Sequence, residues 1–184
     1  MIMQKKPTFL SKYRYFPAIF PALLVVSLLS PIAAKAATGD IEQENSKEWQ
    51  ETPLELPASP QAENLLAFYD SGSQSFSIDV KSLTIASDGT IRYTLVSSSI
   101  SGAKNISFEG IRCQTAEKKL YAFGRPDGSW SRSRRDQWEK ISYTGFNKQH
   151  STLLNDYFCE GTTIAGKAEQ IVARIKRKQP LKQY

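Results

Sequence analysis

The sequence has very little of the side chains that most often carry catalysis or bind metals. It contains one histidine, His150, and two cysteines, Cys113 and Cys159. A zinc site usually gathers several closely spaced cysteines and histidines, so we expect no metal ion here. No serine stands in the G-x-S-x-G context of a nucleophile elbow, and no cofactor fingerprint is present. The sequence therefore predicts no catalytic residue and no cofactor.

The sequence also lacks an apolar run long enough to cross a membrane. Its longest run, between Pro21 and Pro31, has about ten residues, whereas a spanning helix needs about 20. Basic residues without any acid precede this run, and small residues around Ala36 follow it. That order is typical of a secretory signal, so we predict a signal peptide over residues 1–36, cleaved before Ala37. An uncleaved anchor is the alternative, and no cysteine lies near the site to carry a lipid.

The exported part has almost no net charge. Five of the 24 basic residues and none of the 18 acidic residues fall within residues 1–36, which leaves 19 basic against 18 acidic residues. The high pI therefore belongs largely to the signal, and nucleic acid is not the expected partner. The remaining charge is uneven, because residues 37–79 carry nine acids against Lys47 alone. We expect this acidic part to be solvated or to lie across the basic body.

The two cysteines both belong to the exported part. In an oxidising compartment such a pair most often forms a disulfide, and we predict the bridge Cys113–Cys159. Closing a loop of that length would stabilise the fold by roughly 4 kcal/mol in the chain-entropy model.

Beyond the signal, the sequence indicates an acidic, proline-bearing linker or arm over residues 37–60 and a single domain over residues 61–184. The prolines at the end of the first segment exclude a regular helix there. The second segment reads as one α+β domain, a meandering antiparallel β-sheet with one or two late α-helices and one disulfide.

A β-hairpin is the clearest local pattern. Apolar and polar residues alternate over residues 76–85 and again over residues 91–95, on either side of Asp88 and Gly89. Asp-Gly favours a tight hairpin turn. The alternation changes phase near Lys81, which predicts a β-bulge there.

Further elements follow along the chain. Residues 106–113 predict a strand with a second change of phase at Gly110, and residues 119–125 predict another strand. Apolar residues recur at helical spacing over residues 151–159 and 165–178.

Several of these segments resemble one family of proteins. They are residues 88–96 and 101–113 with the F-E-G-I-R-C block, Trp130, Trp138, and the D-Y-F-C block at 156–159. Over roughly residues 49–159, the chain resembles the CNP-one-like family of uncharacterised exported proteobacterial proteins. The resemblance implies a periplasmic or envelope location, with no established activity and no assigned catalytic residues.

Charged residues of the predicted strands form the first candidate binding group: Arg92, Glu109, Arg112 and Arg125. If they project from one face of the sheet, their guanidinium groups would suit a carboxylate or phosphate. The alternative is a set of cross-strand ion pairs on a solvated face.

A basic, tryptophan-bearing loop forms the second candidate group: Trp130, Arg132, Arg134, Arg135 and Trp138. Such a loop suits an envelope polyanion, because guanidinium groups bind anionic oxygens and tryptophan stacks on flat ligands. The alternatives are that the tryptophans anchor the core and that the arginines are solvated or receive the acidic arm.

His150 is expected at a helix start in a surface or capping role. The sequence thus predicts a periplasmic, non-enzymatic binding or protein-interaction module, with an envelope polyanion or a periplasmic protein as partner. One alternative is an enzyme that acts on an envelope glycan or peptide, with Glu109 or Asp79 as its acid or base. Another is a purely structural partner in an envelope complex.

Overall fold

The computed structural model describes residues 48–135, 137–144 and 148–182. The predicted signal peptide and the first part of the predicted linker lie outside the described residues. Within the described residues, no helix is long and apolar enough to cross a membrane.

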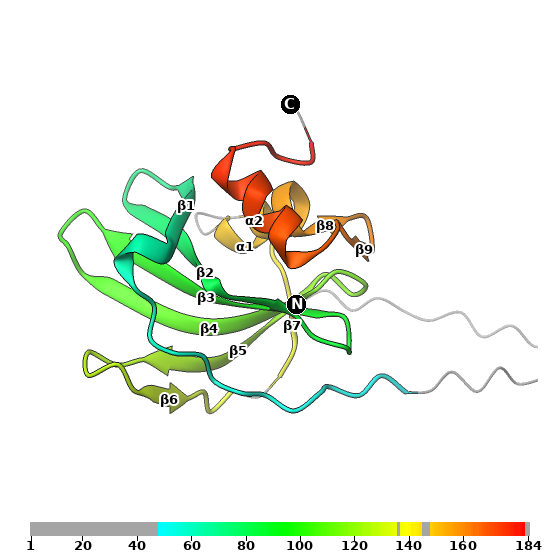
Figure 1. Ribbon diagram of the computed structural model, residues 1–184, viewed down its shortest axis with the longest axis horizontal. Helices are drawn as coiled ribbons and strands as arrows, with labels where there is room; N and C mark the ends of the chain where they lie inside the picture. Colours follow the sequence, from blue (N-terminus) through cyan, green and yellow to red (C-terminus); the bar gives the residue numbers. More distant parts are fainter. Residues whose placement is uncertain (1–47, 136, 145–147, 183–184) are drawn as a thin grey trace, which may run out of the picture. The chain divides into compact units, whose positions relative to one another are not determined.

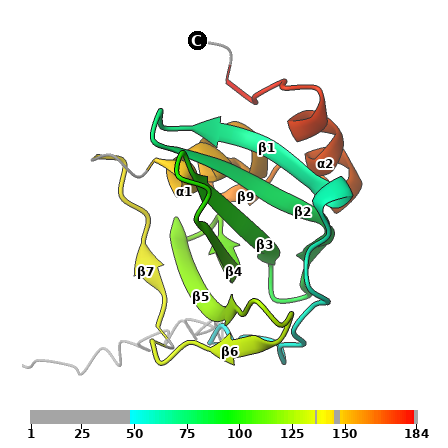
Figure 2. The ribbon, with the colours of Figure 1, turned by 90° about the vertical axis from the view of Figure 1, so that its left-hand side faces the viewer.

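An antiparallel sheet of seven strands dominates the domain (Figures 1 and 2). A short 3-10 turn, η1 (Ala62–Asn64), leads into it. Its strands are β1 (Leu65–Asp70), β2 (Gln74–Ile85), β3 (Thr90–Ser99), β4 (Lys104–Arg112), β5 (Glu117–Gly124), β6 (Trp130–Arg132) and β7 (Glu139–Lys140). The first six lie side by side in chain order, and β7 pairs with β5. The predicted meander is confirmed.

The β2–β3 hairpin has the predicted turn. Gly89 adopts a φ of 80°, and Asp88 Oδ1 accepts the backbone N–H of Thr90 at 2.8 Å. The register between β2 and β3 shifts between Asp79 and Thr84, which confirms the bulge predicted near Lys81. The buried Ser82 of this bulge donates to the carbonyl of Asp79 and accepts the N–H of Thr94.

The change of phase predicted at Gly110 is wrong. The register of β3 with β4 runs without a break from Thr90 opposite Arg112 to Ser98 opposite Lys104. The pattern of β4 loses its alternation because both faces of this strand are buried. The one irregularity lies in the pairing of β4 with β5, between Phe108 and Glu109.

The late helices cover one face of the sheet. They are α1 (Gln149–Thr152), continued by a π-helical segment η2 (Leu153–Phe158), and α2 (Ala168–Lys176). A small hairpin of β8 (Cys159–Glu160) and β9 (Thr163–Ile164) joins them. Figure 1 shows α1, α2 and this hairpin on the same side of the sheet. The main core lies between these helices and the sheet. There the rings of Tyr93 and Phe158 meet edge to face, with their centroids 5.2 Å apart.

Residues 49–60, here named the covering segment, lie against the opposite face of the sheet. This extended segment is drawn in cyan in Figure 1 and passes along β4, β5 and β6. Its Leu54 and Leu56 pack on a second apolar cluster, centred on Phe108 and Tyr121. Each face of the central sheet therefore has its own cover, and the strands between are buried on both sides.

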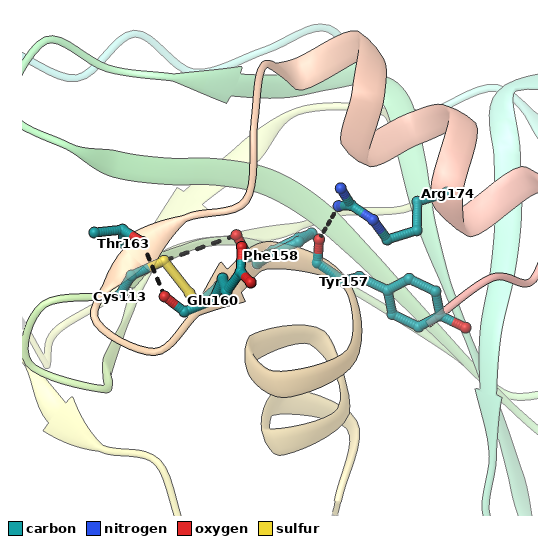
Figure 3. The surroundings of a disulfide bond; sticks show 7 residues. Cys113, Tyr157, Phe158, Glu160, Thr163 and Arg174 are labelled. Carbon is teal, nitrogen blue, oxygen red and sulfur yellow. Dashed lines mark hydrogen bonds between the residues drawn. A yellow bond between two sulfur atoms is a disulfide. The ribbon is translucent and has the colours of Figure 1, made fainter. Parts of the chain in front are cut away.

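The predicted disulfide joins Cys113, directly after β4, to Cys159, at the start of β8 (Figure 3). Both cysteines are buried, and their Cα atoms lie 5.5 Å apart. Close by, Arg174 of α2 donates hydrogen bonds to the carbonyls of Tyr157 at 2.6 Å and Ala165 at 2.9 Å. The bridge ties the helical layer to the sheet, and the arginine joins α2 to η2 and to the segment after β9.

Candidate functional site

Arg92 of β3, a predicted binding residue, is held by the covering segment. Its guanidinium donates to the carbonyls of Pro53 at 3.0 Å and Thr52 at 2.7 Å. It also lies 3.2 Å from the carboxylate of Asp88. Burial would raise the pKa of Asp88, but hydrogen bonds from Thr52 and Thr90 outweigh burial and hold that pKa below its ordinary value.

Arg112 of β4 lies against two tryptophan rings. Its guanidinium carbon is 3.6 Å from the ring centroid of Trp49 and 5.4 Å from that of Trp138. Trp49 belongs to the covering segment and donates its indole N–H to the carbonyl of Asp88 at 2.8 Å. A cation held against aromatic faces in a partly dry site is stabilised by the ring quadrupoles.

Glu51 completes these contacts. Its carboxylate accepts hydrogen bonds from the Lys119 ammonium group at 2.8 Å and from the Tyr121 hydroxyl at 2.6 Å. Burial and the Glu51 carboxylate together raise the pKa of Tyr121 far above its ordinary value. Trp130 donates to the carbonyl of Pro57 at 2.7 Å.

The covering segment therefore already contacts four of the predicted binding residues: Arg92, Arg112, Trp130 and, through Trp49, Trp138. An external anion would have to displace the Trp49 ring and the carbonyls of this segment to reach them. A ligand-binding role for these four residues stays a prediction.

Glu109 lies on the other face of the sheet. It stands opposite Tyr93, whereas Arg92 stands opposite Gly110, and side chains of neighbouring residues in a strand point to opposite faces. The expectation that Glu109 shares a face with Arg92 and Arg112 is therefore wrong. Arg125 lies beyond the end of β5, in the exposed turn to β6.

Glu109 forms a buried hydrogen-bonded cluster with His150. The His150 Nε2 and Glu109 Oε2 atoms are 2.7 Å apart, and their side chains are 14% and 9% exposed. The Tyr93 hydroxyl donates to the same carboxylate at 3.1 Å, and the Ser107 hydroxyl donates to it at 2.6 Å. The surface or capping role predicted for His150 is therefore wrong.

The charge state of this cluster does not suit an acid catalyst. Burial would raise the pKa of Glu109, but the His150 ring and the Ser107 hydroxyl outweigh burial and hold that pKa below its ordinary value. Burial and the charge of Glu109 raise the pKa of Tyr93 well above its ordinary value. Ser107 donates to the carboxylate and not to the imidazole, so the contacts do not form a nucleophile–base pair.

A groove of about 380 Å³ lies at the β5–β6 end of the sheet. We name it the edge groove, and its lining residues are Leu120, Phe123, Ser131, Arg132, Ser133, Arg134 and Arg135. Phe123 is 50% exposed, an unusual state for a phenylalanine. The three arginines are exposed, and within the described residues none of them forms an ion pair.

The structure thus divides the predicted binding residues into two groups. Arg132, Arg134 and Arg135 meet at one open groove, whereas the other predicted residues lie elsewhere. Leu120 and Phe123 were not predicted to line a site. The sequence did indicate that Phe123 and Ala122 face opposite sides of the sheet, because adjacent residues of a strand point to opposite faces.

Comparison with known proteins shows which family this chain resembles. The CNP1-like family model matches residues 44–176. Over 155 residues the chain is 28% identical to Cryptic neisserial protein 1 of Neisseria gonorrhoeae, an alignment that covers 74% of this chain and 76% of that protein. No solved structure matches. The resemblance to CNP-one-like proteins is confirmed.

Proposed function

The chain belongs to the CNP1-like family, and we propose that it is an exported, non-enzymatic protein of the cell envelope that binds an anionic partner at the edge groove. Export is supported by the composition of residues 1–36, where a basic region, a short apolar core and a small-residue site follow in order. The disulfide agrees with it, since such bridges persist in oxidising compartments.

The binding role is supported mainly by three exposed guanidinium groups that line the edge groove together with apolar side chains. Arg132, Arg134 and Arg135 have no carboxylate partner within the described residues, and Phe123 is half exposed beside them. A guanidinium group binds carboxylate and phosphate oxygens through paired N–H donors. An apolar surface bordered by such donors favours a ligand with both anionic and apolar parts.

The contacts of Glu109 argue against its use as a general acid. Three donors already bind its carboxylate, and its pKa is lowered, whereas a general acid needs a raised one. Asp79 is buried in the β2 bulge, where its carboxylate accepts the N–H of Lys81.

Cell fractionation and sedimentation test this proposal. The full chain, expressed in a Gram-negative bacterium, should be recovered from the periplasm without residues 1–36, as intact mass would show. The recovered protein should then sediment with isolated cell envelopes at low salt and be released as salt rises, because mobile ions screen exposed charges. Lipopolysaccharide vesicles, peptidoglycan sacculi and protease-treated envelopes identify the class of partner.

Two triple variants make the test specific to the groove. Substitution of Arg132, Arg134 and Arg135 by serine should abolish sedimentation. The matched control replaces three exposed lysines outside the groove by serine and should sediment like the wild type. These lysines are Lys81, Lys104 and Lys176. Retention in the cytoplasm, or equal binding by both variants, would overturn the proposal.

A further inference from the structure

We propose that the anionic partner is an extended acidic peptide segment, which adds as a further strand to the free edge of β6. This inference rests on the proposed function and specifies its ligand. It follows from the backbone of β6, from the two sides of the edge groove and from the charge at this edge.

Among the described residues, no backbone group pairs with the outer edge of β6. β6 is the last strand in the order of the sheet and pairs only with β5 within the described residues. On the inner side, the backbone carbonyl of Ser129 accepts the N–H of Arg125 at 2.8 Å, and the N–H of Ser133 donates to the backbone carbonyl of Tyr121 at 2.8 Å. In an antiparallel pair the backbone groups alternate in direction, so those of Trp130 and Arg132 point away from β5.

The edge groove includes residues that belong to both faces of the sheet. Phe123 and Ser131 are paired and share one face, while Arg132, the next residue along β6, stands opposite Ala122 on the other. The groove therefore runs around the edge. An added strand presents side chains to both faces at once, so its apolar residues would cover Phe123 and its carboxylates would meet Arg132.

The charge at this edge selects the kind of strand. Exposed edge strands often carry basic residues, which repel a second basic strand and so prevent association of like chains. Arg132, Arg134 and Arg135 would act in this way toward another copy of β6. An acidic strand reverses the sign of the interaction. A compact phosphate or sugar acid would bind the guanidinium groups but leave the backbone edge and Phe123 unused.

Binding of a synthetic peptide tests the inference. The probe is a fluorescein-labelled heptapeptide of alternating glutamate and valine, titrated with the exported wild-type protein and followed by fluorescence anisotropy. We expect saturable binding that weakens between about 50 and 300 mM salt. The Arg132, Arg134 and Arg135 triple variant should bind the probe at least about tenfold more weakly. A peptide with lysine in place of glutamate should not bind.

Backbone methylation separates strand addition from simple charge attraction. In a strand, alternate residues direct their N–H groups to the same side, so N-methylation of all valines or of all glutamates blocks opposite edges. One methylated peptide should lose about tenfold in affinity, the value of roughly one hydrogen bond, and the other should bind like the parent. Equal binding by the two methylated peptides would overturn the inference.

A pair of protein variants tests the same edge from the other side. Arg132→Pro and Arg132→Ser both remove the charge, but only proline removes the outward N–H. We expect Arg132→Pro to bind the probe about tenfold more weakly than Arg132→Ser. If no peptide binds while the arginine triple variant still fails to sediment with envelopes, the strand inference is wrong and the proposed function stands.

Discussion

Nε2 of His150 lies 2.7 Å from Oε2 of Glu109, and this contact ties α1 to the centre of the sheet. Both side chains are largely buried, and the carboxylate also accepts the hydroxyls of Tyr93 and Ser107. A buried carboxylate that loses a partner keeps the cost of its desolvation.

Removal of the imidazole should therefore destabilise the domain. We expect His150→Ala to lower the free energy of unfolding by about 2–3 kcal/mol, measured by urea denaturation, because Glu109 would remain buried with fewer donors. His150→Gln is the matched control, since its amide can still donate to Glu109, and it should recover part of the loss. Equal stability of the alanine variant and the wild type would show that the contact contributes nothing.

The same carboxylate should shape the dependence of stability on pH. The pKa of Glu109 is lower in the folded protein than its ordinary value of 4.5, so its contribution is present above that value and is lost as pH falls through the folded pKa. Stability should decrease on acidification below about pH 5, and Glu109→Gln should make this decrease shallower. Asp88 and Glu117 also have lowered pKa values, so part of the slope should remain.

A control for this measurement is available in β7. The Glu139 side chain is 50% exposed and lies 3.4 Å from the Lys118 ammonium group. Glu139→Gln should keep the slope of the wild type, because exposed ion pairs contribute little. A shallower slope in this variant than in Glu109→Gln would contradict the assignment to the buried cluster.

The disulfide should contribute more to stability than any single polar contact. Cys113 and Cys159 are separated by 46 residues, and closing such a loop is worth about 4 kcal/mol in the chain-entropy model. We expect reductant to lower the free energy of unfolding by about that amount and so to lower the urea midpoint of the wild type. The double variant Cys113→Ser, Cys159→Ser should show the lowered midpoint with or without reductant. A wild-type midpoint that does not respond to reductant would contradict this role.

The fold could be predicted because its long strands follow simple rules. The β2–β3 hairpin has a favourable Asp88-Gly89 turn and clear alternation, so sequence alone placed both strands and the bulge. Strands β1, β6 and β7 were missed. β6 and β7 have only two or three residues, which give no period. The change of phase predicted at Gly110 was wrong for a different reason. Alternation fails in β4 because the covering segment and the helices bury both of its faces.

The candidate site could be predicted only in part. Three closely spaced arginines in a polar segment indicated an exposed basic loop without any knowledge of the fold. The partners of the other charged residues are distant in sequence, as with Glu109 and His150, 41 residues apart, or Lys119 and Glu51, 68 residues apart. No local pattern gives such a pairing, because it depends on how the helices and the covering segment pack on the sheet.

Gly110 should not accept a side chain. A Cβ atom at this position would lie 2.7 Å from the Tyr121 hydroxyl oxygen and 3.0 Å from Cγ2 of Thr90. We expect Gly110→Ala to lower the free energy of unfolding by about 1–3 kcal/mol, the usual cost of overpacking. Tyr121→Leu removes the nearest atoms, so the alanine substitution should cost less in that background, and a double-mutant cycle by urea denaturation measures the difference. Additive effects would mean that the two side chains do not compete for space.

Trp49 should hold the covering segment on the sheet. Its ring lies 3.6 Å from the guanidinium carbon of Arg112, and its indole N–H donates to the carbonyl of Asp88. Trp49→Ala removes both contacts and should lower the free energy of unfolding by about 2–3 kcal/mol. It should also let the segment detach, so that an endoprotease specific for glutamate cleaves after Glu51 and Glu55 faster than in the wild type. Gln50→Ala, an exposed neighbour, is the control and should change neither property. Unchanged cleavage of the Trp49 variant would show that the contacts of Glu51 and Thr52 suffice to hold the segment.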